Sequence, residues 1–395
     1  MMSTVGGEDA FPVFAWAVGE EGSDPLVLAD GVPYRHDQFA QSGHYSHTDD
    51  DLGSIASLGV KIVRYGAPWR LTEPEPGHYD WALWDRALAG CAEHGLEPVV
   101  DLLHFGLPDA FSGFADQRWV DSFGRYVEAF LDRYPEPRWF TPINEPGVTA
   151  MMSGCLGMWN DRLASGPDHA RILANIVLAN LEALERIRSD RGGWWIGAEA
   201  FEVPVPVTPQ AEADVWALRA WTWLVWDLHF GRDPLPGTAH HLDPVDDGVL
   251  ERIRSLAVTD RVVAGLDFYP TSLTPIGGPA PEWSVEQRVA FAIDEFRRWH
   301  KRYGVPFWVA ETSNLSLAVS DQIPWLLSLT DGLRRLRDEG LPIRGLCWYS
   351  RGDQFDWQTD LMDPKGAVTE VGLFDDRRQV RPVAATFAHL ASQVF

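Results

Sequence analysis

Pro306-Phe307-Trp308-Val309-Ala310-Glu311 is a short apolar run that ends in a carboxylate. A near-continuous apolar run of this length is typical of a strand that is buried on both faces of a parallel sheet. The pattern occurs eight times, in Phe11–Val18, Lys61–Ala67, Pro98–His104, Trp139–Asn144, Trp194–Phe201, Val262–Tyr269, Pro306–Glu311 and Ile343–Ser350. We therefore predict eight parallel strands.

Amphipathic segments of helical period separate the predicted strands and follow the last one. They are Asp50–Leu58, Trp81–His94, Gln117–Tyr134, Asp168–Asp190, Pro209–Leu228, Val285–Tyr303, Pro324–Glu339 and Arg381–Gln393. Alternation of strand and helix, with a helix closing the chain, favours a closed barrel over an open doubly wound sheet. The predicted fold is α/β, with residues 1–395 forming a single (β/α)8 TIM barrel.

Composition excludes several classes of function. The formal net charge of -24 makes the surface repel phosphate backbones and anionic lipids, so we expect no nucleic-acid or membrane partner. The three cysteines lack CxxC spacing, which predicts isolated thiols in a reducing compartment. The first ten residues do not resemble a secretory leader and no apolar run is long enough to span a membrane, so we expect a cytoplasmic protein.

Polar and aromatic residues gather where the predicted strands end, which is the active face of a (β/α)8 barrel. Glu145 and Glu311 follow two separate strands, and such a pair can serve a retaining glycosidase as proton donor and nucleophile. The predicted substrate-binding residues are Glu21, Arg64, His104, Asn144, Tyr269, Trp348, Asp356 and Trp357. Glu199 and Glu202 could bind sugar hydroxyls or face solvent. We predict a carbohydrate or glycoside substrate, and no metal or organic cofactor.

Six motifs in order resemble those of glycoside hydrolase family 1, the β-glucosidase and β-galactosidase family of retaining (β/α)8 enzymes. They are Arg64 with Trp69, Leu102–Pro108, Thr141–Pro146, Trp226–Pro236, Gly265–Tyr269 and Val309–Ser313. The resemblance implies that Glu145 is the acid/base, that Glu311 is the nucleophile and that Asn144 contacts the sugar 2-hydroxyl.

Departures from the family pattern leave the sugar open. Glu20 and Glu21 stand near the place of a Gln, Asp267 replaces an Asn, and Asp356 replaces a Glu that grips the 4- and 6-hydroxyls. The Ser/Lys pair that 6-phosphorylated sugars require is not found after the eighth strand. We expect an unusual or modified glycone, such as a deoxy or amino sugar.

The predicted mechanism fixes a distance. Retention requires the two carboxyl groups to lie about 5 to 5.5 Å apart, and ionised Glu311 should raise the pKa of Glu145. Arg64 and Tyr269 are expected to keep Glu311 ionised. An endo-acting glycanase, a transglycosidase and a catalytically silent sugar-binding barrel are the alternatives, and the oligomeric state stays open.

Overall fold

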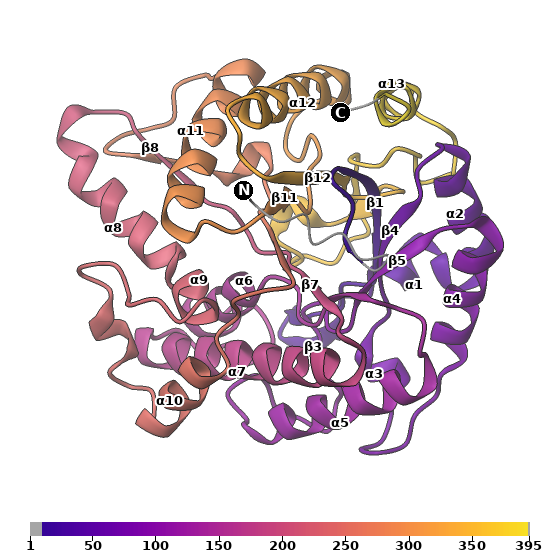
Figure 1. The fold of residues 1–395 in the computed structure, drawn as a ribbon, viewed down its shortest axis with the longest axis horizontal. Helices are drawn as coiled ribbons and strands as arrows, with labels where there is room; N and C mark the ends of the chain where they lie inside the picture. The colour runs from indigo at the N-terminus through magenta and orange to yellow at the C-terminus, as the bar shows by residue number, and fades with distance from the viewer. Residues whose placement is uncertain (1–9, 394–395) are drawn as a thin grey trace, which may run out of the picture.

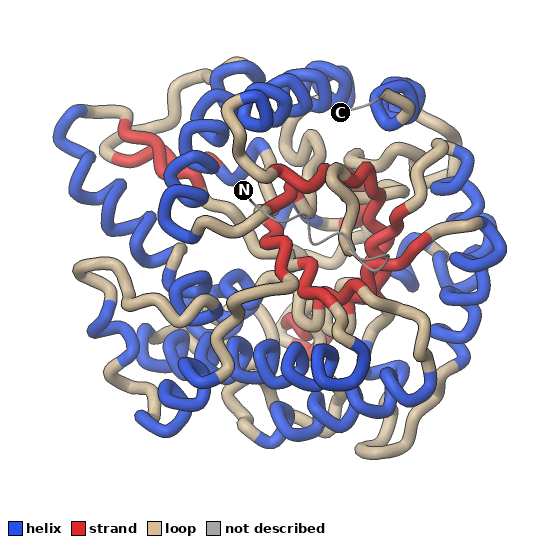
Figure 2. The backbone as a smooth tube through the Cα atoms, in the orientation of Figure 1, coloured by secondary structure: helices blue, strands red, loops and turns tan. Residues whose placement is uncertain are grey.

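A closed barrel of eight parallel strands forms the centre of the computed structural model, which describes residues 10–393. The strands follow each other around the barrel in the order β1, β4, β5, β6, β7, β9, β11 and β12. Their bounds are Ala15–Glu21, Ile62–Gly66, Glu97–Asp101, Trp139–Thr141, Trp194–Ile196, Val262–Gly265, Phe307–Val309 and Ile343–Trp348. Figure 2 shows them as a ring surrounded by helices. The predicted (β/α)8 barrel is confirmed.

The outer ring is helical, and each predicted helix has a counterpart in it (Figure 1). The principal helices are α2 His44–Ser57, α4 Ala82–His94, α5 Arg118–Arg133, α7 Gly166–Arg191, α8 Glu212–Thr222, α9 Leu224–His229, α10 Asp247–Ser255, α11 Val285–Tyr303, α12 Gln322–Asp338 and α13 Pro382–Ala391. Shorter helices are α1 Gln38–Ser42, α3 Trp69–Thr72 and α6 Pro146–Ala150, which runs into the π-helix Met151–Cys155.

Three short strand pairs among the described residues lie outside the barrel sheet. β2 Leu26–Ala29 pairs with β3 Val32–Arg35, β8 Val203–Pro206 with β10 Leu273–Ile276, and β13 Gln354–Phe355 with β14 Val368–Thr369. The apolar-run pattern did not predict these short strands, nor did it predict α10. Single-turn 3-10 helices lie at Pro209–Ala211, Ala239–Leu242, Pro270–Ser272, Val319–Asp321 and Trp357–Thr359.

One predicted helix is divided. The segment Pro209–Leu228 forms a 3-10 turn, α8 and α9, with a break at Trp223. Tyr303 of α11 donates a hydrogen bond from its hydroxyl to the carbonyl oxygen of Trp223. The break thus lies where a tertiary hydrogen bond reaches the backbone of a segment whose helical period is continuous in the sequence.

Side chains of the barrel strands alternate between two apolar layers, as expected for a strand period of two residues. Ile62, Trp308 and Cys347 belong to the cluster inside the barrel. Val63 and Trp348, their chain neighbours, belong to the larger cluster between strands and helices. This alternation decides which side chains at the mouth can reach the barrel axis.

Two strands approach each other unusually closely at a glycine. A Cβ atom on Gly265 of β9 would lie 1.7 Å from the carbonyl oxygen of Gly197, which follows β7. Only a residue without a side chain fits there.

Two sequence expectations concern targeting. No helix within residues 10–393 combines the length and the apolar composition that a membrane crossing needs. The first nine residues, on which the expectation about a leader rests, lie outside the described residues.

Candidate active site

A pocket of about 280 Å³ opens at the carboxyl ends of the barrel strands. Its polar lining comes from loops after several different strands and includes His104, Glu145, Asp267, Tyr269, Glu311 and Tyr349. All of them lie at or near the ends of predicted strands, although Tyr349 was not predicted to contact the substrate.

Glu145 and Glu311 converge in this pocket. One oxygen from each of Glu145, Asp267 and Glu311 lies within 4.8 Å of the others. Retaining glycosidases hold their carboxyl groups about 5 to 5.5 Å apart, and inverting enzymes hold them about 6.5 to 9.5 Å apart. The arrangement thus matches the shorter spacing.

The backbone presents Glu145 at a sharp turn from β6 into α6. Glu145 has φ of 40° and precedes Pro146, the first residue of α6. Its amide donates to the carbonyl oxygen of Ala198, which follows β7. A left-handed backbone at a residue that is not glycine is uncommon and often marks a functional position.

Arg64 of β4 is the charged centre beneath the pocket and is fully buried. Its guanidinium donates to Glu311 at 2.6 Å, to Glu21 at 3.1 Å and to Asp101 at 3.0 Å. It also donates to the amide oxygen of Asn144 at 2.5 Å. One buried cation therefore compensates several buried carboxylates, a function that the planar five-donor guanidinium suits.

Tyr269 completes the surroundings of Glu311. Its hydroxyl donates to Glu311 at 2.7 Å, on the oxygen opposite to the one that Arg64 contacts. Each oxygen of Glu311 thus accepts one hydrogen bond, and the one from Arg64 is charge-assisted.

His104 and Asn144 form a connected pair on the next side of the pocket. The His104 ring contacts Asp101 at 2.8 Å and the side-chain amide of Asn144 at 3.2 Å. His104 lines the pocket, whereas the predicted contact Asn144 is fully buried beneath it, with its side chain bonded to Arg64 and His104.

Burial raises the pKa of Glu145 well above its ordinary value, and the negative charges of Glu311 and Glu199 raise it further. Glu199 lies behind Glu145, where it accepts hydrogen bonds from the amides of Gly147 and Ala200. Burial raises the pKa of Glu199 to about 8. Burial and the neighbouring carboxylates thus favour the protonated form of Glu145, which is the form that an acid catalyst needs.

The predicted contact Glu21 lies deeper than expected. Its carboxyl is buried against Arg64, and burial raises its pKa. It belongs to the charged layer under the pocket rather than to the lining.

Two predicted sugar contacts require correction. Trp348 is fully buried in the outer apolar layer and donates from its indole to the carbonyl oxygen of Val371. Alternation along β12 turns the next residue, Tyr349, into the pocket instead. Asp356 accepts from the amides of Gly366 and Ala367 and contacts His36, so its oxygens are engaged inside the protein.

Trp357 does line the pocket, together with residues that sequence reasoning missed. The additional lining is largely apolar and comprises Phe105, Val148, Met151, Met152, Leu156, Trp159 and Leu315. Several of these residues lie on α6 and the following π-helix, which no catalytic motif marks. Gln354 and Glu202 add polar groups at the rim.

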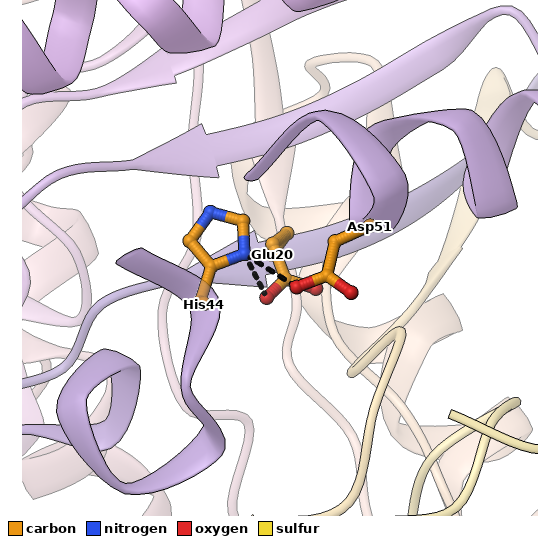
Figure 3. Close-up of side chains that lie close together, drawn as sticks. All are labelled: Glu20, His44 and Asp51. Atoms are coloured by element: carbon orange, nitrogen blue, oxygen red, sulfur yellow. Dashed lines mark hydrogen bonds and ion pairs between the residues drawn. The ribbon is translucent and has the colours of Figure 1, made fainter. Parts of the chain in front are cut away.

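A second buried acidic cluster lies beside the barrel (Figure 3). The His44 ring points at the carboxylates of Glu20 and Asp51, at 3.2 and 2.9 Å. Arg351 contacts both of these carboxylates, and Arg378 contacts Asp51. Two guanidinium groups thus supply the positive charge that a metal ion would bring, so we assign the cluster to structural support of the β1 end.

Comparisons with known proteins agree with this geometry. The family model described as glycosyl hydrolase family 1 matches residues 32–231. A 6-phospho-β-galactosidase from Lacticaseibacillus rhamnosus is 25% identical over 53% of this chain and 46% of its own length. β-Glucosidase A from Acetivibrio thermocellus is 24% identical over 42% of this chain and 38% of its own length. The chain thus spans less than half the length of these curated relatives.

Solved structures resemble the whole barrel. The β-glucosidase from Exiguobacterium antarcticum B7 has a TM-score of 0.81 at 17% identity, over 96% of this chain and 97% of that one. The β-glucosidase from Thermotoga maritima in complex with deoxynojirimycin has a TM-score of 0.81 at 16% identity, over 97% and 98%. These likenesses concern the fold, and the family match covers half of the sequence. The chain belongs to glycosyl hydrolase family 1.

Proposed function

We propose that this protein is a retaining β-glycosidase in which Glu311 is the nucleophile and Glu145 is the acid/base. The observation that carries the proposal is the approach of their oxygens to within 4.8 Å inside one pocket. Family membership supports the same reaction class.

In the first step, the Glu311 carboxylate attacks the anomeric carbon while Glu145 transfers its proton to the departing glycosidic oxygen. A covalent glycosyl-enzyme forms and the aglycone leaves as an alcohol. In the second step, Glu145 removes a proton from water, which displaces Glu311 with net retention. The charge of Glu311 disappears in the ester, and this lowers the pKa of Glu145 for its second task.

The pocket disfavours a phosphorylated sugar. Among the described residues that line it, none is a lysine or arginine, and Arg64 beneath it already contacts three carboxylates. Lys365 is exposed and paired with Asp363. We therefore propose that the glycone carries no phosphate. Because several sugar-contacting positions differ from the family pattern, we also propose that the glycone is an unusual or modified sugar. A screen of aryl β-glycosides, including fucosides, xylosides and amino sugars, would identify it.

The catalytic assignment is tested by azide rescue of two variants on an activated aryl β-glycoside. Glu311→Gly should lose turnover by a factor of about 10⁴ or more, and azide should restore it with an inverted glycosyl azide as product. Glu145→Ala should instead yield the retained azide, because Glu311 still forms the intermediate. Undiminished activity of Glu311→Gly, or the same anomer from both variants, would contradict the assignment.

A further inference from the structure

Asp267 has an unusual position between the two proposed catalytic carboxyls. It follows β9 and Leu266, and its amide donates to the carbonyl oxygen of Glu199 at 2.9 Å. Its side chain lines the pocket, yet only 1% of the residue is exposed. Asp267 takes no part in the two proposed steps of glycoside cleavage.

Both carboxyl oxygens of Asp267 lack a hydrogen-bond donor among residues 10–393. The nearby donors are committed elsewhere, since Arg64 contacts Glu21, Asp101, Asn144 and Glu311. The Tyr269 hydroxyl donates to Glu311. An ionised carboxylate that is buried without a donor is strongly unfavourable.

A proton shared with a neighbouring carboxyl would supply the hydrogen bond that Asp267 lacks. One oxygen of Asp267 lies within 4.8 Å of one oxygen of Glu145. Glu311 is a poorer partner, because each of its oxygens already accepts from Arg64 or Tyr269. A proton between Asp267 and Glu145 gives both groups a partner, and it leaves one negative charge on the pair instead of two.

We propose that Asp267 and Glu145 act as a proton-sharing carboxyl pair, in which Asp267 is a positioning residue that keeps the catalytic proton available on Glu145. The pair rests on the proposed function of Glu145 as the acid/base. Removal of the last shared proton would place two charges side by side in a buried site, so the pair should retain it to higher pH than either group alone.

Most of the charges around Asp267 also favour its protonated form. The titratable and charged groups facing Asp267 come from several barrel strands and loops and are Glu145, Glu199, Glu311 and Arg64. Burial raises the pKa of Asp267 well above its ordinary value, and the three carboxylates raise it further, while Arg64 lowers it. Tyr269, whose pKa is also raised by burial, stays a neutral donor.

The test is the pH profile of Asp267→Asn, which keeps the shape of the side chain but cannot ionise. Its alkaline limb of kcat/KM should move to lower pH by about one unit or more, because Glu145 then ionises next to a neutral amide. The shift should be pronounced for aryl glycosides with poor leaving groups. It should shrink for a dinitrophenyl glycoside, whose departure needs no proton.

Asp121→Asn is the matched control. Asp121 undergoes the same change from carboxyl to amide, but it is exposed on α5 and does not line the pocket. Its alkaline limb should move by less than about 0.3 units, because Asp121 lies outside the pocket that holds Glu145. If the Asp267→Asn enzyme is folded and active but the alkaline limb of its kcat/KM profile does not move, the proton-sharing pair is rejected.

A second measurement does not depend on turnover. Infrared spectra of the wild-type protein should contain a protonated-carboxyl band that persists to alkaline pH, and Glu145→Gln should weaken it. If that band is absent at neutral pH, the pair is rejected even where Asp267→Asn fails to fold. Failure of the proposed function has a different signature, namely a wild-type protein that cleaves no aryl glycoside while the band is present.

Discussion

Glu311 receives one hydrogen bond on each oxygen, from Arg64 and from Tyr269. These two bonds fix the orientation of the carboxylate, which lines the pocket. The two donors differ in what their loss would do. Arg64 also compensates Glu21 and Asp101, whereas the hydroxyl of Tyr269 donates to Glu311. Tyr269 is therefore the residue at which the hydrogen bond can be tested without unbalancing the buried charges.

Tyr269→Phe should lower kcat/KM for an aryl β-glycoside by about 10- to 150-fold. The range follows from about 1.5 to 3 kcal/mol for a hydrogen bond to a charged group. Tyr45→Phe is the control, because Tyr45 donates to Asp37 outside the pocket. Its kinetics should stay within about twofold of the wild type. Equal kinetics for Tyr269→Phe and the wild type would show that the bond to Glu311 has no part in the reaction.

At the scale of elements, the site depends on how closely β7 and β9 approach. Asp267, which follows β9, lines the pocket, and Glu199, which follows β7, lies behind Glu145. Gly197 and Gly265 let the two backbones come together, and the bridge between Ala200 and Asp267 continues the pairing beyond them. The close approach of Gly197 and Gly265 therefore sets the spacing between the carboxyl groups of Glu199 and Asp267.

Gly265→Ala should destabilise the fold by about 3 kcal/mol or more, because the added methyl group would collide with a backbone carbonyl that cannot rotate away. Gly166→Ala is the matched control. Gly166 begins α7 and has open space around its missing side chain, so this change should be neutral or stabilise by up to about 1 kcal/mol. Thermal unfolding of both variants measures the difference, and similar melting temperatures would refute the close-contact argument.

At the scale of the whole molecule, the first and last parts of the described chain close the barrel together. β1 pairs with β12 from Ala15↔Gly345 to Val18↔Trp348. Phe387 of α13 packs its ring edge-on against Trp16 of β1, with centroids 5.3 Å apart. In Figure 1, α13 lies at the same side of the barrel as α12. Closure therefore relies on segments that are far apart in sequence.

Phe387→Ala should cost about 3 to 5 kcal/mol, the usual range for a fully buried phenylalanine. Val380→Ala, at a residue that is 65% exposed, should change stability by no more than about 0.5 kcal/mol. The comparison is made by thermal or urea unfolding, with activity as a second readout of closure. A Phe387→Ala protein as stable as the Val380→Ala control would mean that α13 does not contribute to barrel closure.

The sequence by itself determined the barrel, because each central strand is a separate apolar run and eight of them alternate with amphipathic helices. It also placed Arg64, Asn144, Glu145, Tyr269 and Glu311 at strand ends, since the residue after a buried strand must lie at the mouth. These are local properties of the chain, which explains why they could be predicted without coordinates.

Only the tertiary structure decided which of these side chains share the pocket. The pleat of β12 turns Trp348 outward and Tyr349 inward, and a one-residue difference of this kind depends on register. The engagement of Asp356 with His36 and the isolation of Asp267 among other carboxyls depend on segments that are distant in sequence. Burial and charge compensation are properties of the assembled fold, and they decide which carboxyl keeps its proton.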